Sequence, residues 1–261
     1  MRVDTTPEVK RDFWKEYSTA AGVYTVGEIF NSNENYCASY QGSALDATLN
    51  YPIFWDLRDV FSNKKSMYTL RSRLDAIRAA YNDNSILGNF IDNHDNSRFL
   101  HLTDSHTLLK SALTYIHTLE GIPITYYGTE QYFNGDTDPN DREPLWPTKL
   151  EHTDMYNFLG QLNGARKNLK WWESPMLERW CDDTFYAFSR GDVLVALSND
   201  DQNDSTRHIT YSDYSAGTVL VNQFDESDTV TVGDDGSYDV TLVQGQPKIY
   251  SPQSAEVFLQ E

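Results

Sequence analysis

Three acidic residues stand where short apolar segments of the chain end. Glu28 lies at the end of the segment Val23–Ile29, and Asp95 follows Ile86–Ile91. Asp4 takes the same place if the first three residues are the end of a strand. The carboxyl ends of neighbouring parallel strands meet at one edge of a sheet. Like charges crowded in a cleft raise one pKa, so this edge would place a protonated acid beside an ionised base.

Each of these acidic residues also has an ordinary structural interpretation. A single acidic residue at the end of a strand more often caps the next helix or lies in a solvated loop. Three of them on one rim of one sheet are harder to explain in that way. The rim is therefore our first candidate for a catalytic site.

Two segments could instead suggest a metal site. His94 and Asp95 are adjacent in the sequence, so their side chains point in different directions and are poorly placed to hold one ion. The segment that begins at Asp136 resembles the start of an EF-hand loop, but Asp141 stands where that loop needs glycine and Pro147 where it needs glutamate. The sequence contains no G-x-S-x-G, P-loop or G-x-G-x-x-G pattern, so serine hydrolysis and nucleotide binding have no support.

The elements that must position these residues alternate before residue 173. Apolar periodicity predicts strands over Val23–Ile29, Ile86–Ile91 and Ile122–Tyr127, and helices over Lys10–Ala21, Met67–Tyr81, Thr107–Leu119 and Met155–Lys167. Strands that alternate with helices favour a parallel sheet in an α/β layer or barrel.

The helical period ends after residue 173. Short strands are predicted over Thr184–Ser189, Val193–Leu197, Gly217–Val221, Thr229–Val232, Tyr238–Leu242 and Lys248–Tyr250. Regularly spaced short strands are typical of an antiparallel sandwich. The charge changes at the same place, because residues 173–261 hold 17 acidic and only 4 basic residues. Both changes indicate a domain boundary.

The composition disfavours several classes of partner. The chain has 261 residues and a formal net charge of −18, which repels phosphate backbones and anionic lipid. Its mean hydropathy is −0.60, and no run approaches the roughly 18 apolar residues that a spanning helix needs. We therefore expect no nucleic-acid and no membrane partner. Cys37 and Cys181 could form one disulfide or remain two thiols.

Three motifs together resemble a known family. Arg2–Asp4 (R-V-D), Gly27–Phe30 (G-E-I-F) and Phe90–Asn96 (F-I-D-N-H-D-N) are similar to three signature regions of the α-amylases, in the family's order. The likeness is greatest to the fungal-type enzymes. Further segments resemble the sixth barrel strand (Leu49–Pro52), the eighth strand and its continuation (Gly121–Gln131), a glucan-binding loop (Asp138–Glu143) and, in the acidic tail, the C-terminal β-sandwich.

The resemblance implies an α/β fold class: a partial (β/α)8 barrel that contains strands four to eight, followed by an all-β antiparallel sandwich. Residues 1–172 would form the C-terminal portion of the catalytic barrel, and residues 173–261 the sandwich. The family's first three strands precede the residue that matches Arg2, so we expect a C-terminal fragment, a truncated gene product or a degraded copy. A cut parallel sheet has two open edges, and we expect such a chain to aggregate and to hydrolyse little starch.

The family cleaves internal α-1,4 bonds of starch and glycogen with retention. By motif position, Asp4 would be the nucleophile, and Glu28 the general acid that later acts as the base. Asp95 would bind sugar hydroxyls and stabilise the oxocarbenium-like transition state. A retaining mechanism needs two carboxyl groups about 5–5.5 Å apart, which neighbouring barrel strands can provide.

Four other residues would bind the substrate if the resemblance holds. His94 would donate a hydrogen bond to the ring that Asp95 binds. Arg2 would keep the nucleophile ionised and aimed. Asp138 and Arg142 would hold the neighbouring glucose.

The departures from the family pattern lie mostly near the predicted nucleophile. Pro7 and Glu8 replace a Lys-His pair that contacts sugar beyond the cleaved bond, so we expect an altered acceptor side. The family's structural Ca²⁺ would take one ligand from the main-chain carbonyl of Glu8, with most ligands from a segment upstream of this chain. Asp92 stands where glutamate is frequent. Cys37 matches a disulfide cysteine of the fungal relatives, but the expected partner region, residues 78–85, contains no cysteine.

We therefore expect a retaining glycoside hydrolase whose partners are α-glucans such as starch, glycogen and maltooligosaccharides. The alternative is a catalytically inactive amylase fragment that retains partial glucan binding through Asp138, Arg142 and aromatic residues. Transglycosylation would use the same carboxylates. The family implies an extracellular location, although this chain shows no signal peptide. Trp171 and Trp172 lie at the domain junction, where we expect packing between domains rather than a starch platform.

Overall fold

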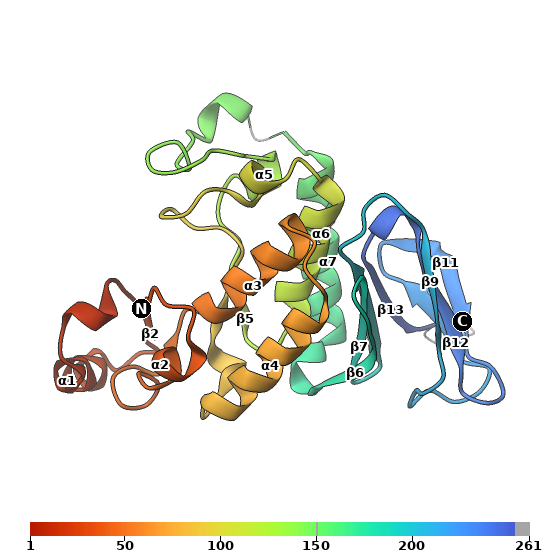
Figure 1. Ribbon diagram of the computed structural model, residues 1–261, viewed down its shortest axis with the longest axis horizontal. Coiled ribbons are helices and arrows are strands. Elements are labelled where there is room, and N and C mark those ends of the chain that lie inside the picture. The colour runs from red at the N-terminus through yellow and green to blue at the C-terminus, as the bar shows by residue number, and fades with distance from the viewer. Residues whose placement is uncertain (150, 254–261) are drawn as a thin grey trace, which may run out of the picture.

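The computed structural model describes residues 1–149 and 151–253 of the chain. The first part contains short parallel strands and most of the helices, and the second part consists of antiparallel strands (Figure 1). The helices α3, α4, α6 and α7 lie between the parallel strands and the antiparallel sheet (Figure 1). The N-terminus and the antiparallel part therefore occupy opposite ends of the long axis.

Five short parallel strands follow one another in chain order. They are β1 (Arg2–Val3), β2 (Val26–Gly27), β3 (Ala47–Thr48), β4 (Gly88–Asn89) and β5 (Ile122–Pro123). β1, β2 and β3 pair in that order, and β4 pairs with β5. A parallel bridge between Leu49 and Gly88 joins the two groups. Within the described residues, β1 and β5 are the outer strands of this row.

Seven α-helices accompany these strands in the described part of the chain. They are α1 (Arg11–Ala21), α2 (Glu34–Ala38), α3 (Tyr51–Ser62), α4 (Tyr68–Ala80), α5 (Phe99–Leu102), α6 (His106–Thr118) and α7 (Asp154–Leu169). Short 3₁₀ turns are η1 (Thr6–Glu8), η2 (Asn84–Ile86), η3 (Thr129–Gln131), η4 (Trp146–Thr148), η5 (Trp171–Glu173) and η6 (Val243–Gly245). Polar caps begin several of the helices. For example, the side chain of Thr153 accepts from the N–H of Tyr156 at the start of α7.

The segment Leu49–Pro52 corrects one sequence prediction. It was expected to be a strand, but the strand is Ala47–Thr48 and Tyr51 already begins α3. The Asn50 side chain accepts from the N–H of Ile53, and Pro52 stands in the first turn. Both features favour the start of a helix, so the apolar residues that follow belong to α3 rather than to the sheet.

Within residues 151–253, the antiparallel part contains eight strands. They are β6 (Met176–Cys181), β7 (Phe185–Arg190), β8 (Val193–Ser198), β9 (Ser205–Ile209), β10 (Val219–Asn222), β11 (Asp225–Thr231), β12 (Tyr238–Leu242) and β13 (Lys248–Pro252). Six of them form one sheet in the order β11-β10-β13-β8-β7-β6, and β12 pairs with β9. A core of side chains such as Phe185, Leu194 and Val240 fills the space between the two sheets. The predicted sandwich is present, with β6 and β9 in addition to the strands expected.

One hydrophobic core continues from the helices into the six-stranded sheet. It contains Leu113 of α6 and Val195 of β8, together with Trp171, whose side chain is 2% exposed. The indole N–H of Trp171 donates to the carbonyl oxygen of His117 (2.9 Å). The expected interdomain packing is confirmed for Trp171, whereas Trp172 is 41% exposed. The predicted boundary between residues 172 and 173 falls within η5 and stays a prediction.

The two cysteines do not form a disulfide with each other. Cys37 is buried and Cys181 half-buried, and both are free thiols. Among the described residues, no helix has the length and apolar character that crossing a membrane would require.

Candidate active site

The predicted site residues follow the carboxyl ends of the parallel strands. Asp4 comes directly after β1 and Glu28 directly after β2. His94 and Asp95 lie in the loop between β4 and α5. Because β1, β2, β3 and β4 run in parallel, these ends share one rim.

One guanidinium group contacts both carboxyl groups of the predicted pair. Arg2 Nη1 lies 3.2 Å from Asp4 Oδ1, and Arg2 Nη2 lies 3.2 Å from Glu28 Oε2. The main-chain N–H of Thr5 donates to Glu28 Oε2 (3.1 Å), and the hydroxyl of Tyr51 donates to Glu28 Oε1 (3.3 Å). The Glu28 side chain is 8% exposed and that of Asp4 67%. The two carboxyl groups are therefore neighbours in different surroundings.

These surroundings move the two pKa values in opposite directions. Burial, followed by the hydrogen bond with Asp4, raises the pKa of Glu28. The hydrogen bond with Glu28 lowers the pKa of Asp4, and the positive charge of Arg2 acts in the same direction. Glu28 therefore holds its proton to a higher pH than Asp4 does, and Asp4 is the first of the two to ionise. A protonated carboxyl beside a carboxylate can act as general acid and nucleophile.

A second polar group surrounds Asp95. Its carboxylate lies 3.3 Å from His94 Nε2 and 3.4 Å from Arg142 Nη2. The Nε of Arg142 also donates to the carbonyl oxygen of His94 (2.9 Å) and pairs with Asp138 (3.3 Å). Arg142 thus ties the loop after η3 to the loop that carries His94 and Asp95.

A cleft of about 620 Å³ joins the two groups. Its lining residues are Asp4, Thr5, Pro7, Glu8, Glu28, Phe30, Asn31, Tyr36, His94 and Asp95. Arg2 lines a smaller adjoining pocket of about 220 Å³, which also reaches His94. Asp138 and Arg142 are not among the lining residues and reach the site through the ion pair with Asp95. The structure therefore places the seven predicted catalytic and substrate-binding residues at one rim. Four of these seven line the cleft itself, as does Glu8, the predicted calcium ligand.

Sequence reasoning missed three residues of this site. Tyr51 was assigned to a strand, and Asn93 was part of the motif Phe90–Asn96 without a role of its own. Phe30 is 58% exposed and lines the cleft, with its ring 5.1 Å from that of Tyr51 and 5.6 Å from that of Trp55. All three lie within or beside the quoted motifs, but the motifs alone do not show that their side chains meet.

Asp92 lies beneath the rim rather than in the cleft. Its carboxylate accepts from the main-chain N–H of Phe99 (2.6 Å) and from the hydroxyl of Thr129 (3.3 Å), with Arg58 4.0 Å away. These contacts hold the start of α5 against η3. Asp92 therefore has a structural role, and its carboxylate oxygens already have hydrogen-bond partners within the protein.

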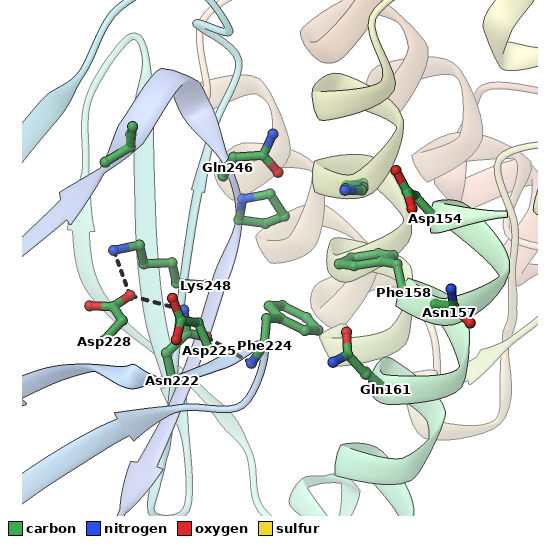
Figure 2. Close-up of a pocket in the computed structure, with 13 residues that line it drawn as sticks. Asp154, Asn157, Phe158, Gln161, Asn222, Phe224, Asp225, Asp228, Gln246 and Lys248 are labelled. Carbon is green, nitrogen blue, oxygen red and sulfur yellow. Dashed lines mark hydrogen bonds and ion pairs between the residues drawn. The ribbon is translucent and has the colours of Figure 1, made fainter.

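A further cavity of about 620 Å³ lies where α7 meets the antiparallel part (Figure 2). Phe158 of α7 and Phe224, between β10 and β11, face each other there with ring centroids 4.8 Å apart. Lys248 pairs with Asp228 at 2.7 Å. No predicted site residue lines this cavity, so the rim remains the candidate active site.

The residues around Glu8 do not form a calcium site by themselves. Ca²⁺ takes six to eight oxygen ligands, of which the Glu8 carbonyl would be one. Across residues 1–149 and 151–253, no group of three or more His, Cys, Asp or Glu side chains could hold a metal ion. We therefore derive no step through calcium.

Parallel strands with polar residues gathered at their carboxyl ends define this chain as part of a β/α-barrel protein, and the sandwich adds a second domain type. The comparisons with known proteins are more specific. Residues 3–202 match the model of the α-amylase catalytic domain, and residues 179–257 match that of α-amylase domain C. The chain therefore belongs to the α-amylase family, which confirms the predicted family and fold class.

Individual relatives agree with this assignment. The chain is 36% identical to the β/α-amylase of Paenibacillus polymyxa over 96% of its own length and 22% of that protein. It is 30% identical to the α-amylase of Saccharomycopsis fibuligera, covering 97% of this chain and 52% of the relative. The solved structure of an α-amylase from Malbranchea cinnamomea superposes with a TM-score of 0.90 at 30% identity, covering 96% of this chain and 55% of that one. The chain spans about half the length of these latter two relatives.

Proposed function

We propose that this site hydrolyses α-1,4-linked glucans with retention of configuration. Asp4 is the nucleophile, Glu28 is the general acid and then the base, and Asp95 binds the sugar at the cleaved bond. The observation that carries the proposal is the contact of Arg2 with both carboxyl groups, which makes them neighbours. Their pKa values shift in opposite directions, which suits Glu28 as the acid and Asp4 as the nucleophile. The names of the relatives, which are amylases, support the choice of substrate.

In the first step, an oxygen of Asp4 attacks the anomeric carbon while Glu28 gives its proton to the departing glycosidic oxygen. The bond to the leaving sugar breaks and a covalent glycosyl-enzyme forms. In the second step, the ionised Glu28 takes a proton from water, whose oxygen attacks the same carbon and releases Asp4. Arg2 stabilises the negative charge as it moves from Asp4 to Glu28.

The remaining predicted residues suit substrate binding. Arg142 holds Asp95 and Asp138 together at the rim, where hydroxyl groups of a neighbouring glucose can reach them. Phe30 and Tyr36 line the cleft and offer ring faces for sugar C–H groups. Pro7 and Glu8 also line the cleft. They stand in place of the family's Lys-His pair, so we expect different contacts to the sugar beyond the cleaved bond.

The test is reducing-sugar release from maltoheptaose and soluble starch by the purified chain. Glu28→Gln keeps the size of the side chain but has no proton to give, so we expect the rate to fall about 10³-fold. Glu178→Gln, which removes a surface carboxylate that pairs with Arg71, is the matched control and should retain full activity. A Glu28→Gln variant as active as the wild type would overturn the proposal.

Glucan binding without hydrolysis is the second candidate. The exposure of Asp4 favours it. The Asp4 side chain is 67% exposed, and in the described part of the chain β1 pairs with one strand only. Water therefore reaches the carboxylate freely, whereas catalysis gains from a site that excludes water. A folded chain that is retained on amylose resin but releases no sugar would support this alternative. Products longer than the supplied maltooligosaccharide would instead indicate transglycosylation.

Two further statements stay predictions. The family resemblance implies an extracellular enzyme, and it implies a structural Ca²⁺ that would take the Glu8 carbonyl as one ligand. Neither enters the proposed mechanism.

A further inference from the structure

We propose that Tyr51 and Asn93 are positioning residues that set the place of Glu28 relative to Asp95. This inference rests on the proposed function, because it concerns the same acid. In the mechanism above neither residue binds the sugar: Tyr51 contacts the carboxyl group of Glu28, and Asn93 contacts Tyr51. They act through a chain of hydrogen bonds beneath the cleft.

The hydrogen bonds run in one direction. The Asn93 side-chain N–H donates to the hydroxyl oxygen of Tyr51 (2.8 Å), and that hydroxyl donates to Glu28 Oε1 (3.3 Å). The other end of the Asn93 amide, Oδ1, accepts from the main-chain N–H of Asp95 (3.1 Å) and from the side chain of Asn96 (2.9 Å). These two donors fix the orientation of the amide, so its N–H group must face Tyr51. Glu28 after β2 and Asp95 after β4 are thus connected through two side chains.

The ring of Tyr51 is packed against three other aromatic rings, which limits the movement of its hydroxyl. Tyr51 is fully buried at the first position of α3. Its ring meets those of Phe30, Phe54 and Phe90 edge-on, with centroids 5.1, 5.5 and 5.0 Å away. Burial also raises the pKa of Tyr51 well above 10, so the phenol keeps the proton that it donates. A fixed donor of this kind restricts Glu28 Oε1 to one position.

In the described part of the chain, the polar groups that contact the Glu28 carboxyl come from the segment around β1 and from α3. Arg2 and Asp4 approach from the segment around β1, the main-chain N–H of Thr5 follows them, and Tyr51 approaches from α3. The carboxyl group of Asp95 lies farther away, near enough to act on Tyr51. Tyr51 is therefore the one neutral side-chain donor among these groups. When Glu28 gives up its proton, this donor stabilises the new carboxylate.

The experiment uses Tyr51→Phe and Asn93→Ala in the full chain. Tyr51→Phe removes the donor to Glu28, so the carboxylate is less stable and the titration of Glu28 must move to higher pH. It can be followed by NMR of chain labelled with ¹³C at the glutamate carboxyl, with the Glu28 signal assigned from Glu28→Gln. In an active chain, kcat should fall about tenfold to 10²-fold with little change in KM, and the alkaline limb of kcat/KM should shift upward.

Tyr115→Phe is the matched control. The Tyr115 hydroxyl is also buried but has no hydrogen-bond partner in the described residues, and it lies in α6 away from the cleft. Its loss should leave the Glu28 titration and the kinetic constants unchanged. Asn93→Ala keeps the phenol but frees it from the amide, so we expect a smaller shift in the same direction.

The outcomes separate the two proposals. A silent wild type whose Glu28 titration moves in Tyr51→Phe but not in Tyr115→Phe overturns the proposed function and supports the positioning role. A wild type that hydrolyses glucan, with Tyr51→Phe indistinguishable from Tyr115→Phe in titration and rate, supports the function and overturns the positioning role. An equal loss in both tyrosine variants would mean a general structural effect and would also overturn it.

Discussion

At the scale of single residues, Arg2 has the most demanding position in the site. Its guanidinium group contacts Asp4, which must stay ionised, and Glu28, which must begin protonated. The pKa of Glu28 rises because burial outweighs the opposing charge of Arg2. The more exposed Asp4 instead has a lowered pKa. Arg2 can therefore contact both carboxyl groups while their pKa values shift in opposite directions, because Glu28 is buried and Asp4 is exposed.

Arg2→Met should reveal this division. Without the positive charge, the Asp4 carboxylate is less stable and its pKa rises, so the ionised nucleophile is lost at a higher pH than in the wild type. We expect kcat/KM to fall about 10²-fold and its acid limb to move to higher pH. The measurement is a pH profile of maltoheptaose hydrolysis.

Arg71→Met provides the control for Arg2→Met. Arg71 pairs with Glu178 on the surface, so its loss should leave the profile unchanged. An unaltered acid limb in Arg2→Met would contradict the assigned role of Arg2.

The motifs predicted the charged residues of the site but not the neutral ones between them. Glu28 and Asp95 follow segments whose apolar patterning predicts strands, and Asp4 was placed by the R-V-D motif. Tyr51 is separated from Glu28 by 23 residues, and Asn93 is separated from Tyr51 by 42. Their contact depends on the register of three strands and on the point where α3 begins, and neither can be read from local sequence.

At the scale of elements, the Glu120 side chain joins α4, η2 and β6, which are far apart in the sequence. Its carboxylate accepts from Arg78 of α4 (2.6 Å), from Asn84 of η2 (2.6 Å) and from the main-chain N–H of Met176 in β6 (3.1 Å). Burial would raise the pKa of Glu120, but these hydrogen bonds outweigh it and the pKa is lowered. The start of the antiparallel sheet is therefore fixed to the helices by one carboxylate.

Glu120→Gln should destabilise the fold by about 2 kcal/mol, since it removes charge-assisted hydrogen bonds from a largely buried site. The pKa of the folded state lies below the ordinary value of 4.5, so the contribution is complete above about pH 4.5. It is lost as the pH falls through the folded-state pKa. Urea unfolding at pH 7 and at pH 3.5 should show a smaller difference between wild type and variant at the lower pH.

Glu178→Gln is the appropriate comparison for Glu120→Gln. Its ion pair with Arg71 is partly exposed and should contribute less than about 1 kcal/mol. A Glu120→Gln variant as stable as Glu178→Gln at pH 7 would show that the three hydrogen bonds do not hold β6 in place.

Element prediction from the sequence succeeded where a period was long and failed where it was short or mixed. α4 and α6 follow clear apolar spacing and were found. The three parallel strands predicted from apolar patterning were expected to be longer than the two residues that each of β2, β4 and β5 contains. β9 (Ser205–Ile209) was missed because four of its five residues are polar. It is a strand because it pairs with β12 (Tyr238–Leu242), which local sequence does not show.

At the scale of the whole molecule, the two parts share one core rather than touching through a polar surface. Arg190 of β7 is buried and donates to the carbonyl oxygens of Thr118 and Leu119, both at 3.0 Å. Burial lowers the pKa of Arg190 to about 10. The sequence indicated the two parts through their charge and periodicity. Their common core could not be predicted, because it joins α6 to strands that lie more than 70 residues later.

The parallel strands leave apolar side chains exposed at β5. Ile122 lies in β5, and Ile124 follows that strand directly and continues the pairing with β4 through its N–H, which donates to the carbonyl oxygen of Asn89 (2.8 Å). Side chains two residues apart along such an extended segment point to the same face. Ile122 and Ile124 are 43% and 38% exposed, whereas parallel sheets are normally covered on both faces. An outer strand with such a face is a template for pairing with another chain. We therefore expect the 261-residue chain to associate as its concentration rises.

Replacing both residues, Ile122→Thr and Ile124→Thr, should weaken this association, because threonine keeps the β-branched shape but lowers the apolar area. Sedimentation velocity over a range of concentrations measures it, and we expect the double variant to remain monomeric at concentrations where the wild type does not. Leu102→Thr alters a leucine of α5 that is equally exposed, at 43%, and should leave association unchanged. If Leu102→Thr and the double variant weaken association equally, general surface hydrophobicity is the cause. A wild type that stays monomeric throughout would show that the exposed face of β5 does not recruit a second chain.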